Sequence, residues 1–434
     1  MASVIADGSG RVPKLRWGIA SLLGFGILVN YIDRVSLGVA GPQLHDDLGI
    51  GPAEFGLLSS AFFYVYAFLQ IPIGVMLDRF GVVIVSRVGA FLWGFAALGT
   101  ALATSFAGIF GARLFLGVAE APAFPANAKA VGYWFPKNER GLATSLFDGA
   151  AKFSNVIAVP LVAYLIVNFG WRASFIATAI LSFIYFILFI VFYRNPSQDK
   201  RLSVAEREFI AAGGAEPEGR PIQKTAGGEF WYVLRQRKVL GLTFGFAAYG
   251  YLFNLFITWL PSYLSATFHT NILKAAGYAA IAWGTATVTD LLVGGYLVDR
   301  LIRAGKDPNR VRLTVLIGGM IAGIAVVGAA YTTDINVAVF WISISLGGLA
   351  ASAPVGWSIP ALIAPKGTQG TVGGIMNFLN NVTGFLSPTI TGLIVATTGS
   401  FALALVSAGV VLALGIVSYV VVMGKIEPVP EQSA

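Results

Sequence analysis

Apolar runs of about 20 residues recur along nearly the whole of this 434-residue chain. A helix of that length crosses the roughly 30 Å hydrocarbon core of a bilayer. Only 12% of the residues are charged, whereas soluble domains carry about 25%. These runs therefore predict an all-α integral membrane protein.

The runs divide into two sets of six around one long polar stretch. We expect a first six-helix bundle in residues 1–193, a linker in 194–238 and a second bundle in 239–434. The linker is expected to carry a short surface helix at 203–212. The twelve predicted transmembrane helices cover residues 17–39, 55–77, 82–103, 106–130, 141–167, 171–193, 239–263, 275–300, 311–331, 335–360, 368–397 and 400–423.

The 29 Lys and Arg residues predict how the chain is oriented. If the N-terminus is inside, the outer loops hold only Arg172 and Lys274, and most of the other basic residues lie in inner segments. Positive charge gathers on the cytoplasmic side of membrane proteins, so both termini are predicted to be cytoplasmic. This pattern explains the pI near 9.6 without nucleic-acid binding, which we do not expect. The polar start MASVIADGSGRVPKLRWG has no cleavage site after a short apolar stretch, so no signal peptide is predicted.

The residue types that are missing exclude several kinds of chemistry. The chain has no Cys, which excludes disulfides and thiol catalysis. The only two histidines, His45 and His269, fall in predicted loops. No Ser/His/Asp set, metal-ligand cluster or phosphate-binding loop is visible. We therefore expect no enzymatic activity, no cofactor and no metal.

One short motif occurs twice. GVMLDRFG (74–81) follows predicted helix 2, and GGYLVDRLIRAGKDPNR (294–310) follows predicted helix 8. Both place Gly-x-x-x-Asp-Arg at a cytoplasmic helix end, which indicates a duplicated six-helix bundle. The candidate gating residues of these loops are Gly74, Asp78, Arg79, Gly81, Asp299 and Arg300.

These loops resemble the loop between helices 2 and 3 of the major facilitator superfamily and its weaker copy between helices 8 and 9. This chain has Val82 and Val83 where the superfamily usually has a basic pair. Two further segments, NYIDRVSLGVA (30–40) and RLFLGVAEAPAFPANAKAVGYWFPKNERGLATS (113–145), resemble the anion:cation symporter family, and its galactonate- and glucarate-type members in particular. The resemblance implies a twelve-helix transporter in a bacterial inner membrane. We expect it to act as a monomer.

Eight ionisable residues fall inside predicted helices, and such residues face a bundle interior or a wet cavity because exposure to hydrocarbon is costly. Four are basic and four are acidic, so they can pair when the cavity is empty. They are Arg34, Arg113, Lys129, Lys152, Asp33, Glu120, Asp148 and Asp290.

The helical register predicts which of these charges pair. Adjacent residues Asp33 and Arg34 point about 100° apart on a helix, so each needs a partner elsewhere. Arg113 and Glu120 are seven residues apart on one face of helix 4, about 10 Å along its axis. Because helices 1 and 4 run in opposite directions, we predict the pairs Asp33–Arg113 and Arg34–Glu120.

These pairs suggest how an anion and a proton are coupled. An Arg that leaves its carboxylate for a substrate makes protonation of that carboxylate more favourable. Arg also suits a substrate carboxylate because it stays charged and binds it with two hydrogen bonds. The resemblance implies that Asp33 and Glu120 carry protons and that Arg34 binds the substrate. The alternative is a static network that moves no proton, in which Arg113 only holds helices 1 and 4 together.

The remaining buried charges have simpler alternatives. Lys129 is expected to reach the membrane surface with its long side chain and to have no role. Asp148 and Lys152 either form a plain i, i+4 pair or shape the substrate pocket. Asp290 has no partner that the sequence predicts.

Neutral polar and aromatic groups are expected to contact the substrate's hydroxyls. For each aromatic residue the alternative is core packing, and for each Asn it is a contact that joins two helices. Pro122 and Pro125 are expected to kink helix 4. By resemblance the cavity-lining positions are Tyr31, Tyr66, Trp357 and Asn377, with Asn381 on the same face.

The sequence thus predicts a proton-coupled symporter of a small organic anion, with a hexonate, hexarate or hexuronate as substrate. An organic-phosphate exchanger would need basic groups from both halves, and the predicted helices of the second half have Arg only at their ends, at Arg300 and Arg312. A membrane enzyme would need a set of catalytic residues, and none is visible in this sequence. A non-transporting nutrient sensor would need a signalling domain, for which the tails and linker are too short.

Overall fold

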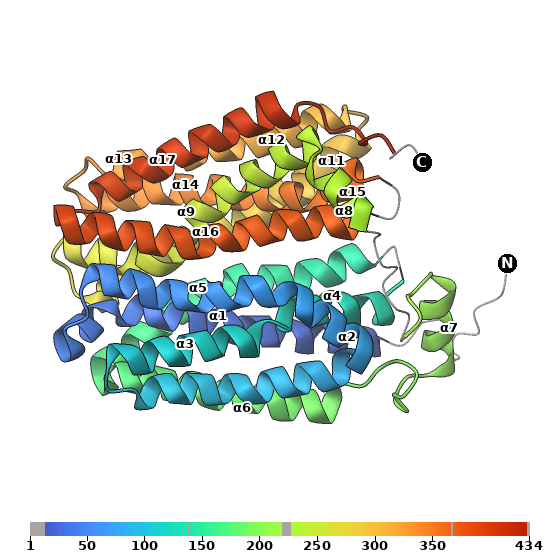
Figure 1. Cartoon of the computed structure of the whole chain (residues 1–434), viewed down its shortest axis with the longest axis horizontal. Helices are drawn as coiled ribbons and strands as arrows, with labels where there is room; N and C mark the ends of the chain where they lie inside the picture. Colours follow the sequence, from blue (N-terminus) through green and yellow to red (C-terminus); the bar gives the residue numbers. More distant parts are fainter. Residues whose placement is uncertain (1–13, 137–138, 219–226, 366–367, 432–434) are drawn as a thin grey trace.

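The computed structural model describes residues 14–136, 139–218, 227–365 and 368–431. Every regular element in these ranges is a helix (Figure 1). Those of the first half and the linker are α1 (Leu15–Leu48), α2 (Pro52–Leu102), α3 (Phe106–Glu120), α4 (Ala123–Trp134), α5 (Arg140–Phe169), α6 (Trp171–Phe192), α7 (Val204–Ala212) and α8 (Gly227–Leu234). Those of the second half are α9 (Arg237–Thr267), α10 (Ile272–Thr289), η1 (Asp290–Leu297), α11 (Val298–Arg303), α12 (Pro308–Gly323), α13 (Val326–Ala329), α14 (Ile335–Ser358), α15 (Pro360–Ile363), α16 (Gln369–Thr398), α17 (Ala402–Val417) and η2 (Ser418–Met423).

Twelve stretches of helix are long and apolar enough to cross a membrane, which confirms the predicted number. The helices run somewhat longer than predicted. The first one was expected to end at residue 39, but α1 continues to Leu48 and ends where Gly49 adopts a left-handed φ of 67°. His45 therefore lies in the last turns of a helix, and its placement in a loop was wrong. His269 does lie outside the helices, as expected.

The α2 helix contains two membrane spans. As one straight helix, its 51 residues would be about 77 Å long, more than twice the hydrocarbon thickness. The chain instead reverses at Gly81, where φ is 77° and ψ is 166°, a conformation that glycine adopts readily because it has no Cβ. The predicted loop between helices 2 and 3 is thus a single sharp kink.

Several spans depart from a regular α-helix, and two of these departures lie beside buried charges. The fourth span breaks at Ala121 and Pro122, between α3 and α4, which confirms the kink predicted from its prolines. The eighth span changes from α10 to the π-helix η1 at Asp290. Nothing in the hydrophobic pattern predicted this change, because one wider turn leaves the apolar run unchanged. Segments of π-helix occur often at functional sites.

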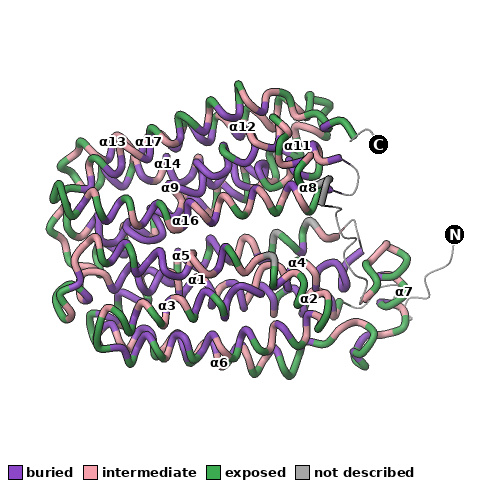
Figure 2. The backbone as a smooth tube through the Cα atoms, in the orientation of Figure 1, coloured by how far each residue is buried: buried purple, intermediate pink, exposed green. Residues whose placement is uncertain are grey.

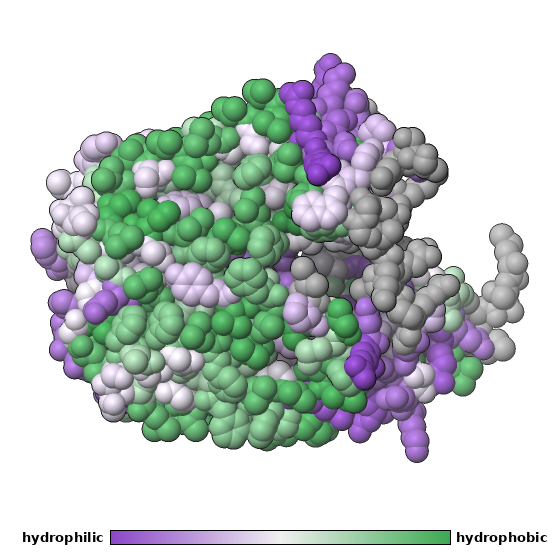
Figure 3. All heavy atoms as spheres, viewed as in Figure 1, coloured by the Kyte–Doolittle hydropathy of each residue, from purple (hydrophilic) through white to green (hydrophobic). Residues whose placement is uncertain are grey.

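The spans form two layers, with α1 to α6 in the lower half of Figure 1 and α9 to α17 in the upper half. Buried residues follow the inner faces of the helices, and exposed residues follow the outer faces (Figure 2). The exposed faces are apolar across the middle of the molecule (Figure 3); α6, for example, exposes Ile180, Ile187 and Val191. Such a surface suits lipid and not water. Both ends of the described chain lie at one end of the molecule, which we call the terminal end (Figure 1).

The linker helix α7 lies at the terminal end, within the predicted range 203–212. Its Glu206 side chain is buried and accepts hydrogen bonds from the backbone and guanidinium of Arg16 at the start of α1. Arg16 also pairs with Glu139 at 2.8 Å. These bonds hold α7 against the first half. The second linker helix, α8, was not predicted.

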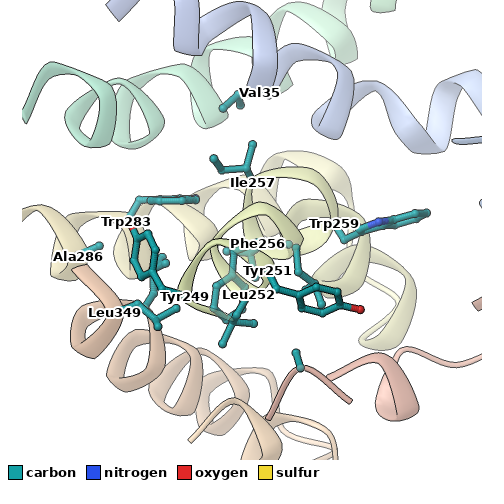
Figure 4. Packing of buried hydrophobic residues seen from close by; sticks show 14 of the residues in the cluster. Val35, Tyr249, Tyr251, Leu252, Phe256, Ile257, Trp259, Trp283, Ala286 and Leu349 are labelled. Atoms are coloured by element: carbon teal, nitrogen blue, oxygen red, sulfur yellow. The ribbon is translucent and has the colours of Figure 1, made fainter. Parts of the chain in front are cut away.

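The two halves pack against each other through α1 with α9, α2 with α16, and α5 with α10. The closest approaches lie toward the end opposite the terminal end, which we call the distal end. A Cβ built on Gly56 would lie 2.5 Å from the backbone oxygen of Pro388, and one built on Gly38 would lie 2.8 Å from that of Ile257. The side chains of Val35 and Ile257 also point toward each other across this contact (Figure 4). Glycine is needed here because the helix backbones almost touch.

Candidate functional site

Asp33 lies in the middle of α1 with its carboxylate buried and both oxygens bonded. Arg113 of α3 approaches Oδ1 at 3.4 Å through its Nη1. The indole Nε1 of Trp93, on the third span, donates a hydrogen bond to Oδ2 at 3.1 Å. The structure confirms the predicted contact of Asp33 with Arg113 and adds a donor that the sequence did not suggest.

Arg34 points away from Asp33, as the register requires, and pairs with Glu120. The distance from its Nε to Glu120 Oε2 is 3.3 Å, and this confirms the second predicted pair. The guanidinium carbon lies 4.5 Å from the ring centre of Phe62, 5.0 Å from that of Tyr31 and 5.1 Å from that of Tyr66. Aromatic faces attract a cation, so these rings hold Arg34 without occupying its hydrogen-bond donors.

Arg34 and Glu120 each keep one buried polar atom without a hydrogen-bond partner among the described residues. These atoms are Nη2 of Arg34 and Oε1 of Glu120. A buried polar atom without a partner is costly and calls for an explanation. A ligand group that accepts from the guanidinium, and a proton or water at the carboxylate, would satisfy them.

Two small cavities adjoin this pair. One is lined by Arg34, Arg113 and Ser59 together with Ile257 and Thr258 of α9, so it lies between the halves. The other lies inside the first half, where Glu120, Trp93, Ser86 and Asn127 line it. Each has a volume of about 20 Å³, enough for a water molecule. Glu120 thus has room for water on the side away from Arg34.

A second charged cluster joins the two halves. The ammonium of Lys152 on α5 lies 2.9 Å from Asp148 Oδ2, one turn earlier, and 3.0 Å from Asp290 Oδ1 in the second half. Asp290, for which the sequence predicted no partner, therefore pairs across the interface. Lys152 and Asp290 side chains are each 6% exposed, whereas that of Asp148 is 33% exposed. We call these three residues the Lys152 triad.

The other predicted contact residues divide into two groups. Tyr31 and Tyr66 lie against Arg34, as described. Trp357 packs edge-on against Phe246 and is 43% exposed. On α16, Asn381 is buried and its amide donates to the backbone oxygen of Asn377. The neighbouring Asn380, which we did not single out, lies against Gly250 of α9.

The first candidate gating loop is held by an ion pair. Asp78, just before the kink at Gly81, pairs with Lys129 of α4. Our expectation that Lys129 simply reaches the membrane surface was therefore wrong, because a carboxylate lies within its reach. Arg79 is exposed and its guanidinium lies over the Phe80 ring. In the second loop, Asp299 and Arg300 are exposed, and Gly74 is partly buried.

The residues that sequence reasoning missed are mostly aromatic. Trp93 reaches Asp33, and Phe62 and Phe63 complete the rings around Arg34. The one available signal was spacing, because Phe62 precedes Tyr66 by four residues and so shares its helix face. Across the described ranges, no group of three or more His, Asp or Glu side chains is arranged to hold a metal ion.

Comparison with known proteins shows the family of this chain. Residues 23–388 match the sequence pattern of the Major Facilitator Superfamily. The uncharacterized transporter YybO of Bacillus subtilis (strain 168) is 40% identical over 96% of both chains. The "Probable galactarate/D-glucarate transporter GudP" of Escherichia coli (strain K12) is 32% identical, over 95% of this chain and 94% of that protein. The "Probable sulfoacetate transporter SauU" of Cupriavidus necator is 33% identical, over 93% and 92%.

A solved structure agrees with the fold. The crystal structure of a bacterial homologue of the human lysosomal transporter Spinster, in an inward-facing and unoccupied conformation, superimposes with a TM-score of 0.75. The comparison covers 95% of this chain and 98% of that one at 17% sequence identity, so it concerns the fold alone. The twelve spans, the matched pattern and the full-length relatives lead to one conclusion: the chain belongs to the Major Facilitator Superfamily, whose members are transporters and not enzymes.

Proposed function

We propose that this transporter couples the movement of a small organic anion, a hexonate, hexarate or hexuronate, to the movement of protons in the same direction. One observation carries the proposal above the others: Arg34 and Glu120 form a buried pair in which each partner keeps one unbonded polar atom. Relatives named for galactarate, D-glucarate and sulfoacetate support an acidic substrate.

The pair provides a simple competition between a proton and an anion. When Glu120 is ionised, its carboxylate pairs with Arg34 and balances the charge of the guanidinium, so no substrate anion is needed there. A proton on Glu120 removes that negative charge and frees the guanidinium, which then binds the substrate carboxylate through two N–H groups. Loss of the proton restores the Arg34–Glu120 pair and expels the anion. Proton and anion are thus bound together or not at all.

Asp33 has a different part in this proposal. Both of its oxygens already accept hydrogen bonds from Arg113 and Trp93, whereas Oε1 of Glu120 has no partner among the described residues. In this conformation Glu120 is therefore the more suitable proton carrier. Asp33 exchanges a proton only when Arg113 moves away from it.

The arrangement of the halves supports alternating access. The halves are in contact toward the distal end. Toward the terminal end, Arg16–Glu139 lies within the first half, Arg140–Glu216 joins the first half to the linker, and Lys238–Glu427 joins the linker to the second half. We place this end in the cytoplasm of a bacterium, with the protein in its inner membrane.

In this proposal the moving units are the bundles 1–193 and 239–434, joined by the linker 194–238. A monomer is sufficient, because the substrate and proton residues all come from one chain. Asn377, Asn381 and Trp357 would contact the substrate from the second half. The loops at Gly74–Gly81 and at Asp299–Arg300 would control the opening at the cytoplasmic end.

Transport by the purified protein in liposomes tests the proposal. A pH-sensitive dye inside the vesicles reports protons while hexonates, hexarates and hexuronates are added outside. We expect at least one of these acids to acidify the interior. An acid that exchanges freely while no acid moves protons would indicate an anion exchanger instead.

The variant Glu120→Gln tests the proton site itself. It keeps a side chain that can bond to Arg34 but cannot release a proton, so we expect proton-driven uptake to be lost and substrate exchange to be retained. Glu216→Gln is the control, because that glutamate also pairs with an arginine but lies at the surface. Normal proton-driven uptake by Glu120→Gln would rule out its role.

A further inference from the structure

The Lys152 triad is not used by the proposed competition at Arg34. It buries an ammonium between two carboxylates, one on α5 and one at the start of η1. Buried ion pairs are poor stabilisers, since removing charges from water costs about as much as their attraction returns. A triad at the interface of two moving halves therefore calls for a role beyond stability.

The exposed fraction of each side chain shows where the triad opens. Asp148 lies within a membrane span, yet its side chain is 33% exposed. A carboxylate facing hydrocarbon at that depth would be very costly, so it faces a water-filled space. Lys152 lies one turn further along α5 and is 6% exposed. It therefore lies at the buried end of that space.

The triad and Arg34 lie on neighbouring helices, because α1, which carries Arg34, packs against α5, which carries Asp148 and Lys152. Tyr31 lies over Arg34, with 5.0 Å between the guanidinium carbon and the ring centre, and is also within electrostatic range of Asp148 and Lys152. From the other half, Tyr249 of α9 is within range of all three triad residues and of Tyr31. Both tyrosines thus lie near the triad, and Tyr31 also lies against Arg34.

We propose that Lys152 is a second anion-binding residue and that the substrate carries an anionic group at each end. This inference rests on the function proposed above. One carboxylate binds Arg34, the other anionic group binds Lys152, and the hydroxyls between them face Tyr31 and Tyr249. The preferred substrate class is therefore a dianion such as a hexarate, and not a hexonate.

The triad has the donors for this role. An ammonium has three N–H donors; Asp148 accepts a hydrogen bond from one of them, and Asp290 lies 3.0 Å away as an ion pair. With both carboxylates ionised, the triad has one net negative charge and would repel an anion. A proton on Asp148 or Asp290 removes this charge and leaves Lys152 able to bind the second anionic group. Each anionic group then enters with one proton.

A purely structural alternative gives a different result. If Lys152 only braces the halves, its removal changes the binding of every substrate alike. If it binds the second anionic group, its removal affects dianions and spares monoanions. D-Glucarate and D-gluconate form a matched pair for this comparison, since they share six carbons and four inner hydroxyls and differ at one terminal group.

The test measures binding of both acids to the purified full-length protein in detergent, from the fluorescence of its nine Trp residues or by calorimetry. We expect wild-type protein to bind glucarate at least tenfold more tightly than gluconate. In the double variant Lys152→Gln/Asp290→Asn, which keeps the net charge of the triad, glucarate should bind as weakly as gluconate. Gluconate binding should change by less than about twofold, and Lys152→Arg should retain the preference.

The outcomes separate this inference from the proposed function. Equal binding of the two acids by the wild type, or equal weakening of both in the double variant, overturns the role of Lys152 alone. A glucarate preference without proton movement in liposomes overturns proton coupling alone. Binding of neither acid overturns the role of Lys152, and the liposome assay with hexuronates then decides the proposed function. If the double variant elutes as an aggregate, the single variants Lys152→Arg and Asp148→Asn replace it. Loss of the glucarate preference in Lys152→Arg then overturns the inference.

Discussion

Two buried carboxylates in this transporter differ in how well they are bonded. Asp33 accepts from Arg113 and from Trp93, whereas Glu120 accepts only from Arg34 and keeps Oε1 free. A hydrogen bond to a charged group contributes about 1.5–3 kcal/mol. In the function that we propose, this difference in bonding is the reason why Glu120, and not Asp33, carries the proton in this conformation.

Trp93 is expected to stabilise the protein through Asp33. The variant Trp93→Phe keeps the ring packing but removes the N–H donor, so we expect a loss of about 1.5–3 kcal/mol and a lower unfolding midpoint in detergent. Trp341→Phe is the control, because Trp341 is partly exposed and packs against Phe340. Equal midpoint shifts in both variants would contradict the role given to Trp93.

A pH effect is expected outside the membrane, at Asp199 in the linker. Hydrogen bonds from the Arg201 side chain, and another from its backbone amide at 2.9 Å, hold the pKa of Asp199 below its ordinary value. Because the ionised form is the bonded one, this stabilisation is complete above about pH 4 and is lost as the pH falls through the lowered pKa.

Hydrogen exchange of residues 195–202 measures this effect. Wild-type protein should protect the segment at pH 7 and lose protection progressively as the pH falls below about 4, after correction for intrinsic exchange rates. Asp199→Asn should lack the protection at pH 7 and change little on acidification. Asp307→Asn, at an exposed ion pair, should leave the segment unaffected. Equal protection in wild type and Asp199→Asn at pH 7 would refute the prediction.

At the scale of helices, length and polarity were sufficient to predict most of the structure. The apolar runs defined the spans, and Pro122 marked the break between α3 and α4. The charge pairs between α1 and α3 followed from register, because both helices are regular around Asp33 and Arg113. The π-helix at Asp290 and the full length of α1 were not predicted, since a local change of backbone winding leaves the hydrophobic pattern intact.

The kink at Gly81 is expected to depend on the ion pair between Asp78 and Lys129. This pair fixes the turn between two spans to α4, so neutral Asp78→Asn should slow transport. The swapped variant Asp78→Lys/Lys129→Asp should recover part of the rate, because it restores the opposite charges. Initial uptake rates in liposomes measure both. A swapped variant no faster than Asp78→Asn would show that the pair itself is not what matters.

At the scale of the whole molecule, the contact between the halves was beyond sequence reasoning. The Lys152–Asp290 pair joins segments that no periodicity relates, and Lys152 had an adequate partner within its own helix. The same holds for Gly38 and Gly56, whose close approach to the second half depends on how the bundles tilt. Register within a bundle is encoded locally, whereas the relative position of two bundles is a property of their whole surfaces.

Closure of the distal end is expected to require Gly56. Its replacement by Val would place atoms against the Pro388 backbone and so keep this end open. Because the chain has no Cys, Ser59→Cys adds a single thiol beside Arg34, at the small cavity between the halves. A membrane-impermeant maleimide added from the distal side should label it in Gly56→Val and not in the parent. Gly111→Val, where a Cβ would meet no atom within 4 Å, should behave like the parent.

The charges of the Lys152 triad also bear on the energy source of the whole cycle. If each anionic group of a dianion enters with its own proton, the loaded carrier has the same net charge as the empty one. A membrane voltage is worth about 2.3 kcal/mol per charge per 100 mV. It then does no work when the substrate-loaded carrier changes conformation, compared with the empty carrier. Potassium diffusion potentials set with valinomycin should leave glucarate accumulation unchanged, while a pH gradient alone should drive it. A cell using this carrier would concentrate its substrate from acidity alone, even when its membrane is depolarised.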